Sequence, residues 1–200
     1  SGSVAWLLNT MGFDKVHVLN NGYKAYRHWA LAQFETNYPI LVLGGKTGSA
    51  KTEILKVWSA QNAATINLEG LAHHKGSAFG WIGEADPPTQ EQFENDLATS
   101  LYDQKHRESI WFEDESERIG LARIPTPLYK QMRASPLYFL DIPKTIRIPY
   151  LIESYAHQGD EKLALSILRI SKKLGGANTK LAIQALHRKD YEQVADLVLY

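Results

Sequence analysis

A short segment in the first quarter of the chain has the composition of a phosphate-binding loop. It reads GKTGSAKT at residues 45–52 and fits the pattern G-x-x-x-x-G-K followed by Ser or Thr, except that Ala50 replaces the second glycine. In such a loop backbone N–H groups and a helix N-terminus hold phosphate oxygens, a lysine reaches the terminal phosphates, and a hydroxyl can ligate magnesium. Lys51 and Thr52 are expected to have the last two roles and to be the catalytic residues. The predicted phosphate-binding set is Gly45, Lys46, Thr47, Gly48, Ser49, Ala50, Lys51 and Thr52.

Ala50 is the position at which this loop departs from the pattern. An alanine is tolerated there if its backbone is already helical, and it is harmful if the position needs φ > 0, which glycine adopts without strain. The sequence leaves both conformations open. A chance glycine-rich turn between a strand and a helix is the alternative to a phosphate loop.

Three acidic residues, Glu113, Asp114 and Glu115, follow a predicted strand at residues 109–112. Acids at the carboxyl end of a strand beside a phosphate loop commonly hold magnesium, directly or through water. The sequence therefore predicts a magnesium site formed by Thr52 with Asp114 or Glu113. A polar loop that opens a helix is the alternative interpretation.

A polar, glycine-rich segment at residues 68–80 is a second candidate for anion binding. Its adjacent histidines, His73 and His74, do not predict a metal site, because neighbours along a chain point in different directions and no further ligand follows at a suitable spacing. Contact with phosphate or ribose is the better interpretation, although each charged residue could also be an ordinary surface charge. The predicted contacts, including those further downstream, are His74, Lys75, Ser77, Arg118, Arg123, Lys172 and Lys173.

Predicted strands and helices alternate around these motifs. A helix begins near Lys51, directly after the loop, and another covers residues 90–102. Strands that alternate with helices predict a mostly parallel sheet with helices on both faces, the α/β fold of P-loop NTPases. The predicted strands are residues 40–43, 65–68, 109–112 and 137–142.

The pattern changes on both sides of this α/β segment. Beyond Pro143 it is helical throughout, with helices predicted at residues 146–156, 161–174, 177–187 and from Asp190. Before it, a helix that ends at Gly12, a strand at 15–19 and a helix at 23–35 form a unit too small to fold alone, typical of the closing part of a larger domain. The predicted domains are that remnant at 1–36, the α/β domain at 37–145 and its helical extension at 146–200.

The composition of the 200-residue chain excludes several kinds of site. The chain has no cysteine, so it contains no disulfide, no thiolate zinc site and no cysteine nucleophile, which fits a reducing cytoplasm. No apolar run approaches the length of a membrane span.

Positive and negative residues balance at 22 each, but they are unevenly distributed along the chain. Residues 84–117 hold eleven acids and two bases, whereas residues 162–189 hold seven bases and no acid. The basic stretch is a candidate surface for a polyanion, and a solvated helix face is the alternative.

Together the ordered motifs resemble the bacterial tRNA 2-selenouridine synthase family. The resemblance is carried by GGKTGS and KT within residues 44–52, LEGLAHHKGSAFG at 68–80, QEQFEN at 90–95, WFEDES at 111–116 and IG at 119–120. It extends upstream to GYKAYR at 22–27 and downstream to KLGG at 173–176 and the closing helices, so it covers nearly all of the chain. The family usually has glycine where this chain has Ala50.

The resemblance implies a transferase that joins an N-terminal rhodanese domain to a C-terminal P-loop domain and modifies the wobble uridine of certain tRNAs. It implies that the sulfur of 2-thiouridine is replaced by selenium from selenophosphate, through an intermediate geranylated with geranyl diphosphate. The P-loop domain would bind the diphosphate and the tRNA anticodon arm, and the rhodanese cysteine would serve the selenium step. Because this chain has no cysteine, it is expected to be part of a longer protein, with residues 1–36 as the end of the rhodanese domain.

The leading hypothesis is therefore the P-loop part of a cytoplasmic tRNA 2-selenouridine synthase that binds geranyl diphosphate and tRNA, with Mg²⁺ as a candidate cofactor and without a membrane partner. One alternative is a P-loop ATPase, GTPase or kinase-like protein. Another is a tRNA-binding module whose phosphate loop is vestigial and which binds through the basic stretch at residues 162–189.

Overall fold

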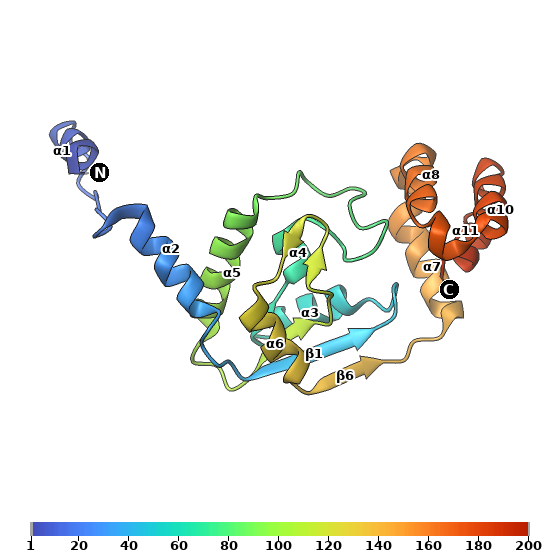
Figure 1. The fold of residues 1–200 in the computed structure, drawn as a ribbon, viewed down its shortest axis with the longest axis horizontal. Helices are drawn as coiled ribbons and strands as arrows, with labels where there is room; N and C mark the ends of the chain where they lie inside the picture. The colour runs from blue at the N-terminus through green and yellow to red at the C-terminus, as the bar shows by residue number, and fades with distance from the viewer. Residues whose placement is uncertain (1, 200) are drawn as a thin grey trace.

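A sheet of four parallel strands forms the middle of the molecule in the computed structural model, which describes residues 2–199 (Figure 1). The strands are β1 (Ile40–Gly45), β2 (Thr65–Ile66), β3 (Ile110–Glu113) and β6 (Leu137–Leu140), in the order β2-β3-β1-β6. In β1, Ile40 pairs with Ile110 of β3, and Val42 pairs with Leu137 of β6. The predicted α/β fold with a parallel sheet is confirmed.

Side chains alternate between the two faces of the sheet along each strand, and helices cover these faces unequally. Val42 and Phe112 lie on one face, in a core shared with α2 (Gly22–Gln33), α5 (Gln90–Gln104) and α6 (Thr126–Ala134). On the other face Trp111 packs against Trp58 of α3 (Lys51–Ala60), with ring centroids 4.8 Å apart. The second face is the more exposed one, since Trp111 is only partly buried.

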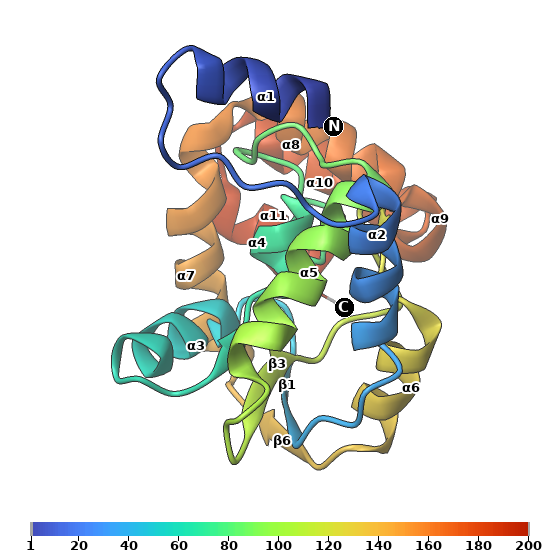
Figure 2. The same ribbon diagram turned by 90° about the vertical axis from the view of Figure 1, so that its left-hand side faces the viewer.

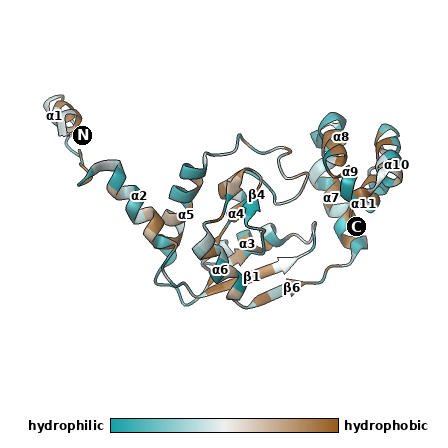
Figure 3. Ribbon diagram, viewed as in Figure 1, coloured by the Kyte–Doolittle hydropathy of each residue, from teal (hydrophilic) through white to brown (hydrophobic). Residues whose placement is uncertain are grey.

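The chain after β6 forms a separate layer of helices at one end of the molecule (Figures 1 and 2). Its core includes Leu163, Ile167 and Leu186, and Ile82 joins it from the loop that follows α4 (Leu68–Ala72). In Figure 3, α8 is hydrophobic along one side and hydrophilic along the other, as expected for a helix that covers a core. The elements are α7 (Lys144–Tyr155), η1 (Ala156–Gln158), α8 (Asp160–Arg169), α9 (Ser171–Leu174), α10 (Gly176–His187) and α11 (Tyr191–Val198).

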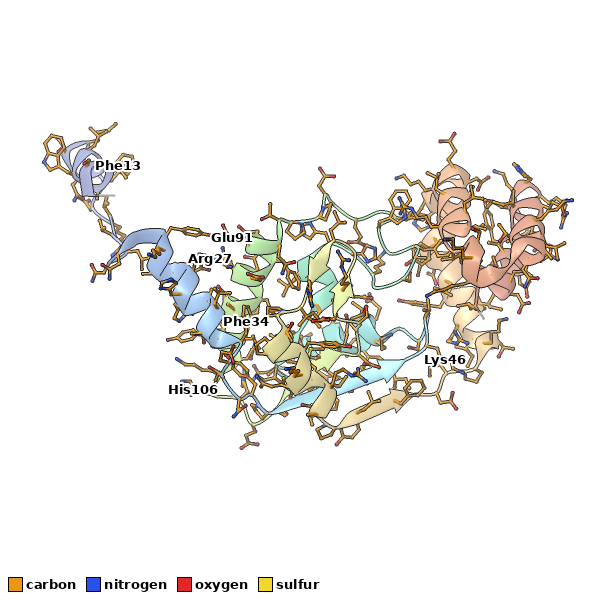
Figure 4. The ribbon with its side chains drawn as sticks, viewed as in Figure 1. Phe13, Arg27, Phe34, Lys46, Glu91 and His106 are labelled. Carbon is orange, nitrogen blue, oxygen red and sulfur yellow. The ribbon has the colours of Figure 1, made fainter. Side chains whose placement is uncertain are left out.

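At the opposite end α1 (Gly2–Thr10) stands away from the sheet and has no buried residue (Figure 1). In contrast, α2 packs against α5, where Arg27 forms ion pairs with Glu91 and Glu94; Figure 4 labels Arg27 and Glu91 at this contact. Phe34, just after α2, lies in the same core as the sheet. The division of the chain at residue 36 stays a prediction.

Several details differ from the sequence prediction, among them the strand predicted at residues 137–142, which ends at Leu140. The strand predicted at residues 15–19 is wrong: no strand forms there, and Val18 and Leu19 are exposed and have no strand to pair with. The predicted helix at 161–174 is two helices, α8 and α9, that meet at Ile170. The strand predicted to reach Leu68 stops at Ile66, because Leu68 begins α4.

A small antiparallel hairpin, β4 (Arg118–Ile119) and β5 (Ala122–Arg123), follows β3. Among the helices of residues 2–199, none is both long and apolar enough to cross a membrane.

Candidate functional site: a phosphate loop between a carboxylate cluster and an apolar cavity

The predicted phosphate-binding residues form one loop between the end of β1 and the start of α3. The backbone N–H of Ser49 donates to the carbonyl oxygen of Lys46 at 3.0 Å, which closes the turn. The ammonium group of Lys51 donates to the carbonyl oxygen of Gly45 at 2.9 Å, so this side chain folds back over the loop. The strand, loop and helix thus have the order expected for a site that holds phosphate at a helix N-terminus.

Ala50 adopts the left-handed conformation in this loop, with φ +58° and ψ +30°, directly before α3. Of the two conformations that the sequence left open, this is the unfavourable one for alanine, because its Cβ crowds the following carbonyl group. The loop therefore stores backbone strain at the residue that replaces the second glycine of the pattern.

Helix α7 of the helical layer packs against the tip of the loop. Gly48 has φ +82°, and a Cβ atom at this position would lie 2.9 Å from the side chain of Leu151 and 3.2 Å from the carbonyl oxygen of Arg147. Glycine is required here both for its backbone conformation and for this close approach. In Figure 4, Lys46 is labelled at the end of the loop, beside the helical layer.

A cluster of three carboxyl groups lies next to the loop. One oxygen each of Glu69, Glu113 and Glu115 lies within 4.8 Å of the others. Thr52 donates its hydroxyl hydrogen to Glu69 at 2.8 Å. The Glu113 side chain is fully buried, and within residues 2–199 neither of its carboxylate oxygens has a hydrogen-bond partner. A buried carboxylate without a partner is rare, because desolvation of the charge is costly.

The same burial shifts the titration of all three acids. Desolvation, followed by repulsion from Glu69, raises the pKa of Glu113 to about 7. Desolvation and repulsion from Glu69 and Glu113 raise the pKa of Glu115 to about 8. Burial also raises the pKa of Glu69, against the opposing effects of the Thr52 hydroxyl and the Lys51 charge. The cluster therefore takes up protons near neutral pH unless a cation balances its charge.

The donor set of this cluster suits a hard divalent cation. Carboxylate and hydroxyl oxygens are the ligands that Mg²⁺ and Ca²⁺ prefer, and the unpartnered oxygens of Glu113 supply lone pairs that no described residue uses. Asp114, the predicted ligand, instead forms an ion pair with Arg133 at 2.5 Å. Its role as a magnesium ligand stays a prediction, whereas the geometry brings Glu113 together with Glu69 and Glu115.

Two cavities meet at the loop. The polar one, of about 660 Å³, is lined by loop residues together with Glu69, Lys75 and Glu115. The other, of about 520 Å³, lies between the loop and the helical layer and is lined mostly by apolar side chains, among them Phe79 and Ile170. Both cavities are lined by Thr47, Gly76, Ser77, Leu151 and Tyr155. A ligand with a polar head and an apolar tail could therefore occupy both.

The structure brings together only some of the other predicted contacts. Ser77 lines both cavities, Lys173 lines the apolar cavity, and Lys75 lines the polar one, where it pairs with Glu84 at 3.2 Å. His74 is turned into the protein, and its ring packs against Gly80 and Gly120. Its Nδ1 is buried without a partner among residues 2–199, and burial lowers its pKa.

The remaining predicted contacts lie outside both cavities. Arg118 and Arg123 belong to the β4–β5 hairpin, where Arg123 pairs with Glu117 at 3.1 Å. Lys172 is exposed on α9. Their contacts with substrate or nucleic acid stay predictions.

Sequence reasoning missed several residues of the site, chiefly Glu69 and Arg147. Glu69 follows β2 and Glu113 ends β3, so the strand-end rule that selected Glu113 could also have selected Glu69. Arg147 lies in an ordinary helical pattern far along the chain, and its sequence neighbours carry no signal of a site. Only the packing of α7 on the loop reveals it.

Comparisons with known proteins agree with this architecture. Residues 38–196 match the family model described as the tRNA 2-selenouridine synthase AAA domain. The chain is similar to curated proteins named tRNA 2-selenouridine synthase: it is 37% identical to that of Shewanella piezotolerans, with 84% of this chain and 51% of that protein covered. It is 33% identical to the protein of Shewanella frigidimarina, with 98% of this chain and 54% of that protein covered. It is 35% identical to the protein of Sulfurovum sp., with 83% of this chain and 50% of that protein covered. The chain thus spans about half the length of these relatives. No solved structure gives a significant match.

Proposed function

This chain belongs to the tRNA 2-selenouridine synthase family, and from that membership we propose that it forms the part of a tRNA-modifying enzyme that binds geranyl diphosphate and transfers the geranyl group to 2-thiouridine in the anticodon arm. The relatives are named for a tRNA substrate and for 2-selenouridine. Geranylation is the step for which a phosphate loop is suited, because its leaving group is a diphosphate.

The observation that carries this proposal is the wall shared by the two cavities. Thr47 and Ser77 border both the polar cavity at the phosphate loop and the apolar cavity beside it. A nucleoside triphosphate would fill the polar side but would leave an apolar cavity of about 520 Å³ without a function. A prenyl diphosphate has the complementary shape, with a charged head for the loop and a hydrocarbon chain for the cavity.

The chemistry requires no nucleophile from the protein. The sulfur of 2-thiouridine forms a bond to C1 of the geranyl group while the bond between C1 and oxygen breaks, and pyrophosphate leaves with the electron pair. The base then releases its N3 proton to water, which leaves a neutral S-geranylated product. Negative charge grows on the leaving group, so Lys51 and the loop N–H groups accelerate the step if they bind the departing pyrophosphate more tightly than the substrate. This role is compatible with a chain that has no cysteine.

We propose that Thr52 with Glu69, Glu113 and Glu115 holds a divalent cation beside the loop. When bound, Mg²⁺ would neutralise part of the pyrophosphate charge. The selenium step, in which selenophosphate is the co-substrate, is assigned to a rhodanese domain of the longer protein, because that step depends on a cysteine.

The test is to mix the protein with geranyl diphosphate and tRNA that contains 2-thiouridine, and to look for the mass gain of geranylation. We expect Lys51→Ala to abolish the transfer because it removes the charge that stabilises the leaving group. Lys24→Ala, at an exposed position of α2, is the matched control and should keep full activity. Undiminished transfer by Lys51→Ala contradicts the role of the loop. Magnesium-dependent hydrolysis of ATP or GTP without geranyl transfer would support the nucleotide-hydrolysing alternative.

A further inference from the structure

Arg147 is a buried cation at the junction of the loop and the helical layer. It lies in α7, and only 6% of its surface is exposed. Its Nη1 donates to the carbonyl oxygen of Thr47 in the loop at 2.8 Å, and its Nε donates to the carbonyl oxygen of Ile142 at 3.1 Å. The guanidinium thus touches the loop directly.

Within residues 2–199 no carboxylate forms an ion pair with this guanidinium. Two carbonyl dipoles offset only part of the desolvation cost of a full charge, and buried charges in proteins are normally paired. Arginine cannot lower this cost by losing its proton, because a guanidinium stays charged in proteins. A buried, unpaired guanidinium therefore favours the binding of an anion.

The surroundings of Arg147 strengthen this argument. The apolar cavity that it lines is also lined by Lys46 and Lys173, and no aspartate or glutamate of residues 2–199 lines that cavity. In the polar cavity, by contrast, lysines face several acids, including Glu69 and Glu115. Positive charge without a counter-charge, in a wall that is mostly apolar, favours an anion in the part of this cavity that adjoins the loop.

We infer that Arg147 binds the diphosphate of the prenyl substrate directly, from the helical layer, so that this layer completes the anion site. This inference rests on the proposed function, since it assumes that a prenyl diphosphate occupies both cavities. A guanidinium donates several hydrogen bonds in one plane, which matches the oxygens of a diphosphate, and charge-assisted bonds of this kind are the strong ones. Arg147 would then hold α7 and the loop tip in contact while substrate is bound.

A purely structural role makes a different prediction. If Arg147 only braces the loop through the Thr47 carbonyl, a neutral hydrogen-bond donor should be able to replace it without loss of diphosphate binding. If Arg147 binds the diphosphate, its replacement must keep the positive charge. Arg147→Gln keeps an N–H donor and loses the charge, while Arg147→Lys keeps the charge and loses the planar fork. The two variants therefore separate bracing from anion binding.

The experiment measures the binding of inorganic pyrophosphate and of geranyl diphosphate by calorimetry, with thermal unfolding of each ligand-free variant recorded to show that it is folded. We expect Arg147→Gln to weaken both affinities at least about tenfold and Arg147→Lys to weaken them less. Arg107→Gln, at an exposed arginine between α5 and β3 and outside both cavities, is the control and should bind as the unaltered protein does.

Two results would overturn the inference while leaving the proposed function intact. The first is that Arg147→Gln binds geranyl diphosphate with an affinity within about threefold of that of the unaltered protein. Loss of a charge-assisted contact should weaken binding by more than this. The second is Arg147→Lys binding no better than Arg147→Gln. Failure of the unaltered protein to bind either ligand would contradict the proposed function itself, and the inference with it.

Discussion

Ala50 combines an unfavourable backbone conformation with a position that should contact phosphate. Its φ of +58° costs alanine on the order of 1 kcal/mol, and glycine adopts the same φ without this penalty. Part of the gain is offset, because glycine also gives the unfolded chain more freedom. We expect Ala50→Gly to raise the free energy of unfolding by about 0.5 kcal/mol and to tighten pyrophosphate binding, measured by urea unfolding and calorimetry.

The control for Ala50→Gly is an alanine-to-glycine substitution at a position where the backbone is in the ordinary right-handed helical conformation. Ala32→Gly, at an exposed position inside α2, should lower the free energy of unfolding by about 1 kcal/mol. Opposite signs at the two sites would show that the conformation of residue 50, and not the loss of a methyl group, determines the effect. Destabilisation by both substitutions would contradict the left-handed conformation of Ala50.

The carboxylate cluster makes stability depend on pH in an unusual direction. The pKa of Glu113 is raised from 4.5 to about 7, and the pKa of Glu115 is raised from 4.5 to about 8. From pH 4.5 up to these raised values, the folded protein therefore binds more protons than the unfolded chain. The stabilisation is fully present below the unfolded pKa and is lost as the pH rises through the folded values. In metal-free buffer with a chelator, we therefore expect the free energy of unfolding to fall as the pH rises from about 5 to about 8, and to change little from these groups above that.

Substitution within the cluster isolates this effect from other titrating groups. Glu115→Gln removes one of the coupled acids and should make urea unfolding between about pH 5 and about pH 8 less dependent on pH. Glu108→Gln, at an exposed position outside the cluster, should leave the pH dependence unchanged. A decline in stability that is equally steep in Glu115→Gln would disprove the contribution of this cluster.

At the scale of elements, the two N-terminal helices differ in their contribution to the fold. Phe34, at the end of α2, is 1% exposed and lies in the core of the sheet, whereas α1 buries no residue. Phe34→Ala should lower the free energy of unfolding by about 3–5 kcal/mol, as expected for a large cavity in a core. Removal of residues 2–19 should change it little, and comparable losses in the two variants would contradict the packing described for α1.

Local patterns predicted most of these elements and failed where tertiary packing decides. The apolar run that became β1 and the amphipathic pattern that became α5 carry their own periodicity, so their positions could be predicted. Val16 and Val18 alternate with polar residues as in a strand, but a strand also needs a neighbour to pair with. The contact of Arg147 with Thr47 joins residues that are far apart in sequence, so no local pattern encodes it.

At the scale of the whole molecule, acidic residues and basic residues are concentrated in different parts of the structure. The acid-rich residues 84–117 include α5, near the α2 end, while the basic residues 162–189 form α8 to α10 at the opposite end (Figure 1). The lysines and arginines of this basic stretch are exposed, and none forms an ion pair within residues 2–199. Lys173, one of them, also lines the apolar cavity. We propose that the helical layer holds the RNA backbone beside the proposed site of transfer.

This arrangement predicts how tRNA binding responds to salt. Each phosphate contact releases counterions, so the logarithm of the binding constant falls linearly with the logarithm of salt concentration, by roughly 0.7–0.9 per contact. The double variant Lys172→Gln and Lys180→Gln should weaken tRNA binding and reduce the slope by about 1–2, measured by titration at several salt concentrations. Lys24→Gln with Lys130→Gln, at exposed positions of α2 and α6, is the matched control with the same change in charge. Equal slopes for the two double variants would mean that tRNA binds elsewhere, because only the loss of phosphate contacts, and not the change in net charge, lowers the number of counterions released.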